Sequence, residues 1–186
     1  MKILTVTGYK PMEMNIFKQD DKRIEYIKAA IKKKIISFIE EGLEWVLISG
    51  QMGVELWAGQ VVQELQDTYD IKLGIIPPFE DQDQRWPDSL KMIYEELVLQ
   101  ADFHQPIYHG GYKGPYQFKA KNQWLVEKSD GCVILLNEEF PGSTRFFYDV
   151  AASANQKNGY PIYLITPMEL EEIVNDIQME NPEHWD

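Results

Sequence analysis

The sequence predicts an α/β fold in which an open, mainly parallel sheet carries helices on both faces, and three observations support this prediction. Short apolar runs alternate about five times with longer segments whose apolar residues recur every three or four positions. The runs lack the polar alternation of half-exposed strands, which is typical of strands buried on both faces. Glycine and proline turns separate the segments. At 186 residues the chain fits one domain, spanning residues 1–186.

The elements follow in order along the chain. Residues 2–7 predict a first strand that ends at Thr7 and Gly8. A helix is expected over about 20–41, because apolar residues recur on one face, Asp20 or Asp21 can cap its start, and Gly42 suits its end. Further strands are expected at 45–48, 71–76, 103–108, 130–137 and 161–165. Two further helices are expected over 89–101 and 117–128. Three more are expected to begin near residue 54, at the turn at 142–145 (ending near 158), and at Pro167.

The strand at 45–48 leads into a glycine turn and a helix, an arrangement typical of an anion site. Glycine lets the backbone approach a phosphate closely, and the free N–H groups of the first helical turn point toward it. Glu55, in that first turn, could reach a ribose hydroxyl or act as an acid or base; alternatively it stabilises the helix dipole by about 0.3–1 kcal/mol. The turn residues expected to hold a ligand are Ser49, Gly50, Gln51, Met52 and Gly53.

Two further connections are candidates for the same site. In the polar loop at 79–86, Arg85 is suited to meet a phosphate and Trp86 to stack on a base. The alternative is a solvated connection whose aromatic residues pack on the body of the protein. In the second turn, Gly142 precedes Ser143 and Thr144, either of which could cap the next helix and also bind a ligand hydroxyl or phosphate. A cap without a ligand role is the alternative there.

Composition excludes several function classes. The net charge of −12 argues against broad binding of nucleic acids or anionic membranes, which usually leaves a basic footprint. This charge is compatible with binding of a small phosphorylated ligand, because backbone amides supply local positive potential. One cysteine, Cys132, excludes an intramolecular disulfide and fits a reducing cytosol. No metal site, secretory leader or membrane insertion is expected, so the sequence predicts a cytoplasmic protein.

The C-terminal region, from about residue 167, is acidic. Residues 169–186 hold seven acids and no lysine or arginine. We expect this helix and tail to be solvated or to form a partner-facing surface.

The strand order brings the candidate turns together. Parallel strands place their carboxyl ends at one edge of the sheet, where such folds bind ligands. The turns at 7–8, 49–53, 77–86 and 141–145 should therefore converge. The dinucleotide fingerprint Gly-x-Gly-x-x-Gly is absent, since Gly50 and Gly53 give only Gly-x-x-Gly, and an ordinary dehydrogenase is not expected. The prediction is a site for a nucleotide or a similar phosphorylated small molecule.

A family resemblance is carried by five segments: 7–9, 49–58, 83–86, 122–130 and 141–144. They resemble the YpsA-like family of Gram-positive bacteria, part of the SLOG superfamily of Rossmann-like domains. This superfamily also includes the DprA DNA-processing proteins and the LOG-type nucleotide phosphoribohydrolases. The resemblance implies a Rossmann-like sheet that binds a nucleotide derivative similar to NAD or ADP-ribose, with Gly53 and Glu55 in its pocket. It also implies a role in bacterial cell-division control, with protein partners there, and a homodimer.

Three functional hypotheses follow. The first is a nucleotide-binding regulator. The second is an enzyme that hydrolyses the N-glycosidic bond of a nucleotide, with Glu55 as its catalytic residue. LOG-type enzymes carry catalytic glutamates directly after their second glycine–threonine turn, whereas Arg145 and two phenylalanines follow Thr144 here, which argues against hydrolysis. The third is a protein-interaction module with a vestigial pocket, in which the acidic tail or an exposed helix face contacts the partner.

Overall fold

The computed structural model describes residues 1–180 and contains a six-stranded, all-parallel sheet of order β4-β3-β2-β1-β5-β6. The predicted open, parallel, Rossmann-like α/β sheet is thus confirmed. Residues 181–186, the last part of the predicted acidic tail, lie outside the described residues. The strands are β1 (Ile3–Thr7), β2 (Trp45–Ile48), β3 (Lys72–Ile75), β4 (Phe103–His104), β5 (Gly131–Leu135) and β6 (Ile162–Ile165).

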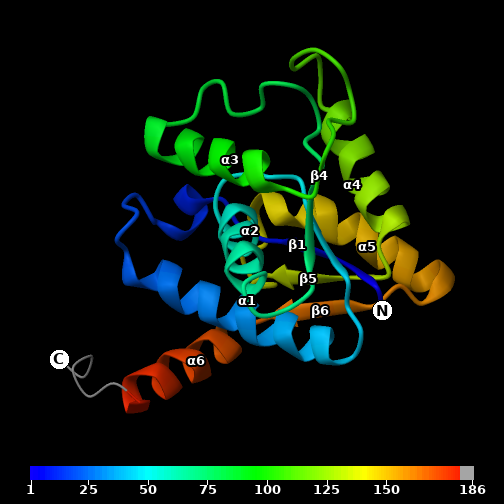
Figure 1. Cartoon of the computed structure of the whole chain (residues 1–186). Helices are drawn as coiled ribbons and strands as arrows, with labels where there is room; N and C mark the ends of the chain where they lie inside the picture. The colour runs from blue at the N-terminus through cyan, green and yellow to red at the C-terminus, as the bar shows by residue number, and fades with distance from the viewer. Residues whose placement is uncertain (181–186) are drawn as a thin grey trace.

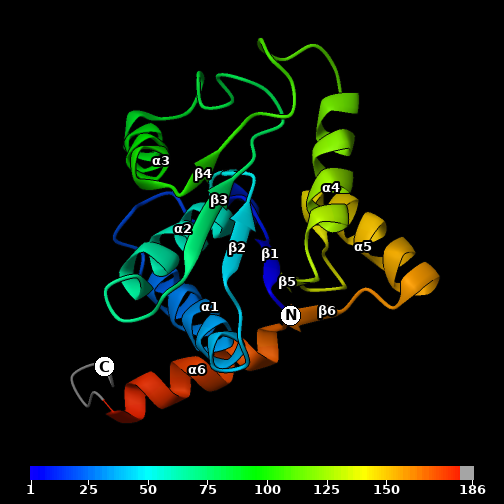
Figure 2. The same ribbon diagram turned by 45° about the vertical axis from the view of Figure 1, so that its right-hand side comes forward.

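Helices cover both faces of the sheet. One layer contains α1, α2, α3 and α6, and the opposite layer contains α4 and α5 (Figure 1 and Figure 2). Over the described residues no helix combines the length and hydropathy needed to cross a bilayer. The helices are α1 (Lys22–Glu40), α2 (Val54–Leu65), α3 (Asp88–Gln100), α4 (Tyr116–Lys128), α5 (Arg145–Asn158) and α6 (Pro167–Glu180), with two short 3-10 helices, η1 (Pro11–Met14) and η2 (Gly142–Thr144).

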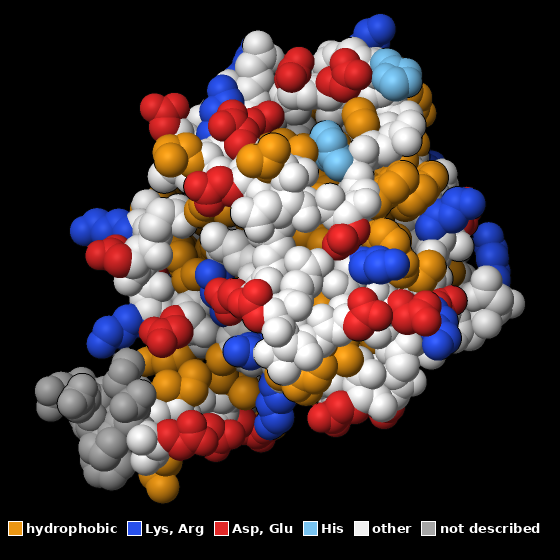
Figure 3. All heavy atoms as spheres, viewed as in Figure 1, with side chains coloured by type: hydrophobic (Ala, Val, Ile, Leu, Met, Phe, Trp, Pro, Cys, Tyr) orange, Lys and Arg blue, Asp and Glu red, His pale blue; other side chains and the backbone are white. Residues whose placement is uncertain are grey.

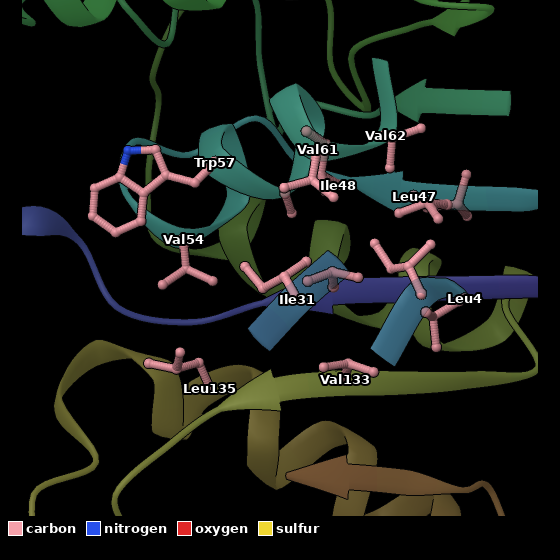
Figure 4. Packing of buried hydrophobic residues seen from close by; sticks show 14 of the residues in the cluster. Leu4, Ile31, Leu47, Ile48, Val54, Trp57, Val61, Val62, Val133 and Leu135 are labelled. Carbon is pink, nitrogen blue, oxygen red and sulfur yellow. The ribbon is translucent and has the colours of Figure 1, made fainter. Parts of the chain in front are cut away.

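The core forms where α1 and α2 pack on the sheet. Helix α1 begins where predicted, because the side chain of Asp21 accepts a hydrogen bond from the Arg23 amide. Ile31 of α1 is fully buried, and so are Leu4 of β1 and Ile48 of β2. Figure 4 shows these side chains together with those of α2 in one continuous layer. Burying each such side chain contributes about 1.5–3 kcal/mol, which holds the helices against the strands.

The strand order places a crevice beside β1. The chain adds β2, β3 and β4 on one side of β1, then crosses back to add β5 and β6 on the other. The connections after β1 and β5 therefore lead to helices on opposite faces. Ligands of open α/β sheets bind at such a switch point, outside the carboxyl ends of the strands.

The predicted strand at 103–108 is wrong beyond His104. The chain continues beside the loop after β3, and Ile107 and Tyr108 donate backbone hydrogen bonds to the carbonyls of Pro77 and Pro78. Prolines have no N–H group to donate in return, so a regular ladder cannot continue there. The segment after β4 is instead a loop that leads to α4.

Candidate functional site

A cavity of about 620 Å³ opens at the carboxyl edge of the sheet, between the end of β1 and helices α4 and α5. We call it the α4–α5 cavity. Thr7 and Gly8 line it after β1, and Gln51 and Glu55 line it beside the start of α2. Its remaining walls come from α4 and from the η2–α5 connection. The cavity therefore lies at the switch point of the sheet.

Glu55 ties three elements together beneath the cavity. Its side chain is only 4% exposed. Oε1 accepts hydrogen bonds from the amide and the hydroxyl of Ser49, both at 2.7 Å, and Oε2 accepts one from the Thr7 hydroxyl at 3.0 Å. The ends of β1 and β2 are thus fixed to the first turn of α2. Glu55 has a structural role in addition to facing the cavity.

Glu55→Ala is expected to lower the free energy of unfolding by about 2–4 kcal/mol, because buried donors left unpaired cost about 1–3 kcal/mol each. The amide of Ser49 cannot turn toward another acceptor. Glu55→Gln should cost less, since its oxygen can still accept from Ser49 and its amide can donate to Thr7. Urea unfolding of both variants measures the difference. Equal stability of Glu55→Ala and the natural protein would contradict this structural role.

In the first glycine turn, residues 49–53, groups of the protein itself take the backbone N–H bonds that a ligand would use. Gly50, Met52 and Gly53 do not line the α4–α5 cavity. The amide of Val54, which follows Gly53, donates to the carbonyl of Tyr9 at 3.1 Å, and the amide of Met52 donates to the side chain of Gln51. Of the turn and its flanking residues, the structure brings Gln51 and Glu55 to the cavity surface.

The loop at 79–86 lies over this closed turn. The side chain of Gln82 donates to the carbonyl of Ser49 at 2.8 Å. Trp86 packs edge-on against Tyr94 of α3, and Arg85 is exposed. Neither Arg85 nor Trp86 is among the residues that line the α4–α5 cavity.

The second turn faces the cavity with Ser143 and Thr144. Gly142 precedes them with a positive φ of 55° and is not part of the lining. Thr144 stands at the capping position of α5 but makes no side-chain capping bond, so its predicted use as a cap is wrong. Its hydroxyl is buried without a hydrogen-bond partner among the described residues.

Sequence reasoning missed the polar residues of α4. Within residues 1–180, three buried side-chain polar atoms lack a hydrogen-bond partner, and two of them, Asn122 Oδ1 and Thr144 Oγ1, belong to residues that line this cavity. Asn122 lies four positions after Phe118 and three before Leu125, which places it on the inward face of the helix. A polar residue on that face is the signal that could have revealed it.

Lys121 is the second missed residue of α4. It lines the cavity, and no hydrogen bond to its ammonium is found among the described residues. Burial lowers the pKa of Lys121, attraction to Glu55 opposes this shift, and repulsion from Lys10 adds to it. Lys10, in the loop after β1, faces the same cavity. The two ammonium groups repel each other there, and an anion would relieve that repulsion.

Aromatic rings form the apolar part of the lining. Tyr116 and Phe118 of α4 face Phe146 and Phe147 of α5 across the cavity. Phe118 is supported from behind by Phe79 and Tyr112, and Tyr116 packs edge-on against Tyr108. The aromatic residues that line this cavity therefore come from α4 and α5, and Trp86 is not among them.

The charge of the cavity differs from that of the chain as a whole. Three lysines, at positions 10, 119 and 121, line it together with two carboxylates, Glu55 and Asp149. On the face drawn in Figure 3, lysines and arginines are interspersed with numerous acids. The cavity is thus a locally basic site in a protein of net charge −12.

Comparison with known proteins places the chain in a family. The family model for YpsA, described as the YspA SLOG family, matches residues 4–170. The chain belongs to the YpsA family. Family members similar to it include the UPF0398 protein OB1025 of Oceanobacillus iheyensis, 59% identical over 100% of both chains. The UPF0398 protein YpsA of Bacillus subtilis is 47% identical over 95% of this chain and 98% of its own.

A solved structure shares the fold of this YpsA-family protein. DNA processing protein A from Helicobacter pylori, described with a single-stranded DNA binding mode, superposes with a TM-score of 0.55 at 12% identity. The match covers 95% of this chain and 81% of that one. At this identity the likeness shows the fold alone. Together with the family match, it confirms the YpsA-like, SLOG-type resemblance found in the sequence.

Proposed function

We propose that this protein binds a phosphorylated, nucleotide-type small molecule in the α4–α5 cavity and acts as a regulator that responds to that molecule. Control of cell division, implied by the family resemblance, is the process in which we place it. The observation that carries the proposal is a pair of buried, unpartnered polar atoms, Asn122 Oδ1 and Thr144 Oγ1, on two residues that line the cavity together with Lys121. Their parent side chains are 5% and 4% exposed.

Unpaired buried polar groups are costly, so their occurrence calls for an explanation. Leaving one without a partner costs about 1–3 kcal/mol, and buried polar groups in native proteins nearly always have partners. A ligand that supplies a donor to Asn122 and an acceptor or donor to Thr144 would recover that free energy. A ribose hydroxyl could donate to Asn122, and a phosphate beside Lys121 could accept from the Thr144 hydroxyl.

The shape and chemistry of the cavity favour a nucleotide over a simple anion. A volume of about 620 Å³ lies within the range of roughly 300–1,000 Å³ typical of small-molecule sites. The lysines suit the phosphates, and the rings of Tyr116 and Phe146 suit a base, since aromatic faces stack on bases of any kind. NAD and ADP-ribose carry both groups and are the first ligands to test.

Hydrolysis of a glycosidic bond is the second candidate, and one observation favours it. Asp149 lines the same cavity as Glu55, so two carboxylates face the space in which a ribose would lie. One could stabilise the ribosyl cation while the other activates water. Chromatographic detection of free base released from each nucleotide tests this activity. Release that disappears in Asp149→Asn would favour it, and intact nucleotide throughout would exclude it.

A thermal-shift panel tests the binding proposal. A ligand at about 100 times its dissociation constant stabilises the folded state by about 2.7 kcal/mol, which raises the unfolding midpoint of a chain of this size by about 5–10 °C. ADP-ribose, NAD, mononucleotides and adenosine form the panel. A shift with at least one phosphorylated compound is expected. A flat panel from cooperatively folded protein would overturn the proposal and favour the partner-binding hypothesis.

Thr144→Val should separate binding from stability. Valine has the same shape as threonine without the unpartnered hydroxyl, so the ligand-free protein should keep or raise its unfolding midpoint. The ligand-induced shift should shrink. Thr68→Val removes the hydroxyl of an exposed threonine and serves as the control. An unchanged ligand shift in Thr144→Val would remove Thr144 from the site.

A further inference from the structure

The side-chain carboxylate of Glu13 already binds the second turn, residues 142–144. Glu13 of η1 accepts a hydrogen bond from the Ser143 hydroxyl through Oε1 and one from the Ser143 amide through Oε2, both at 2.8 Å. Its Oε1 also accepts from the amide of Lys10 at 2.9 Å. Partial burial acts to raise the pKa of Glu13, but the hydrogen bonds from Ser143 and Lys10 outweigh it and lower the pKa. The carboxyl is therefore an ionised anion held by two donors of one residue.

Glu13 is not itself among the residues that line the α4–α5 cavity, but the residue that holds it adjoins that cavity. Ser143 lines the α4–α5 cavity, and the next residue carries the unpartnered Thr144 hydroxyl. Gly142 has no side chain, and a Cβ there would collide with Glu13 Oε2. Lys10 attracts the Glu13 carboxylate and also faces the cavity. An amide and a hydroxyl that both donate to one carboxylate would donate equally well to two phosphate oxygens.

We propose that Glu13 is a built-in competitor that fills the anion position at Ser143, and that a phosphate group of the ligand displaces it. This inference rests on the proposed function and adds to it how the site is regulated. Binding is then an exchange of one anion for another on the same donors. The site accepts phosphorylated compounds that outcompete Glu13, while uncharged nucleosides do not engage this position.

The connections of η1 allow this exchange without disturbing the sheet. The hydroxyl of Tyr9, before η1, donates to the Phe140 carbonyl at 2.6 Å and accepts from the Asn137 amide at 2.8 Å. After η1, the guanidinium of Arg23 donates to the carbonyls of Met14 and Asn15, both at 2.9 Å. Both ends of the segment are thus fixed. Glu13 itself is exposed, so rotation of its side chain is enough to clear Ser143.

The test compares Glu13→Gln and Glu13→Ala with the natural protein, using isothermal titration with ADP-ribose, inorganic pyrophosphate and adenosine. Glutamine keeps the shape but not the charge, and alanine removes the competitor. ADP-ribose and pyrophosphate should bind about three- to tenfold more tightly to Glu13→Gln, and still more tightly to Glu13→Ala, as expected for the loss of charge-assisted hydrogen bonds. Adenosine affinity should not change. Glu25→Gln, an exposed acid on α1, controls for the change in net charge.

Thermal unfolding gives a second readout that a purely structural role would not produce. The ligand-free Glu13 variants should unfold at or slightly below the midpoint of the natural protein, while their ligand-induced shift grows. If the natural protein binds the phosphorylated probes but the Glu13 variants bind them equally or more weakly, Glu13 is not a competitor. The proposed function would then still stand. If neither the natural protein nor any variant binds a probe, the proposed function itself fails, and this inference fails with it.

Discussion

An alanine at position 53 is expected to lower the midpoint of thermal unfolding by about 5–10 °C. Gly53 has φ 97° and ψ −131°, a backbone conformation that side chains rarely permit. A Cβ there would also collide with the carbonyl oxygen of Tyr9, which accepts the hydrogen bond from Val54. The backbone penalty is about 1–3 kcal/mol, and moving the Tyr9 carbonyl adds the loss of that bond.

Gly159→Ala measures backbone strain without a steric contact, at the milder left-handed conformation of φ 75° and ψ 22°. Gly159 also has a positive φ, 75°, but a Cβ there meets no heavy atom within 4 Å. The unfolding midpoint of Gly159→Ala should therefore fall only because of backbone strain. Because the loop that must move in Gly53→Ala carries Lys10, the surviving folded protein should also bind ligand more weakly. Equal unfolding midpoints for the two variants would show that the contact with Tyr9 is unimportant.

Lys121→Met is expected to weaken binding of a phosphorylated ligand about 10- to 100-fold, in line with the 1.5–3 kcal/mol of a charge-assisted hydrogen bond. The ligand-free protein should be as stable as before or more so, because methionine fills similar space without a charge to desolvate. Titration calorimetry and urea unfolding measure the two effects. Lys128→Met, an exposed lysine at the end of the same helix, should change neither.

The pH dependence of these effects follows from the lowered pKa of Lys121. Below that pKa both the folded and the unfolded chain carry the charge, so the folded state pays the cost of burying it and Lys121→Met is the more stable protein. Above it the folded chain releases the proton, and the advantage of the variant shrinks. Affinity of the natural protein for an anion should fall over the same rise in pH. A pH-independent affinity would show that Lys121 does not meet the anion.

The sequence predicted the fold well because the signals that define it are local. The apolar run at 45–48 and the helical spacing from residue 54 match β2 and the start of α2. Of the predicted turn at 141–145, Ser143 and Thr144 line the cavity, whereas their role in binding a ligand stays a prediction.

The features that were missed depend on contacts between distant parts of the chain. The amide of Ser143 donates to the carboxylate of Glu13 in η1, and these two residues lie 130 positions apart in sequence. Likewise, nothing in the spacing around Gly53 shows that the loop after β1 would close the first turn. Lys121 faces the cavity only because α4 and α5 pack together on one side of the switch point.

The contrast between the basic cavity and the acidic exterior has a kinetic consequence. At long range an anionic ligand is repelled by a chain of net charge −12, whereas inside the cavity it meets lysines. Ionic screening acts over about 8–10 Å at physiological salt and weakens interactions between exposed charges far more than those between buried ones. Added salt therefore speeds the approach of the ligand by screening the repulsion, while it only slightly hastens its escape. For such a ligand, the association rate constant rises with ionic strength, the reverse of ordinary electrostatic steering.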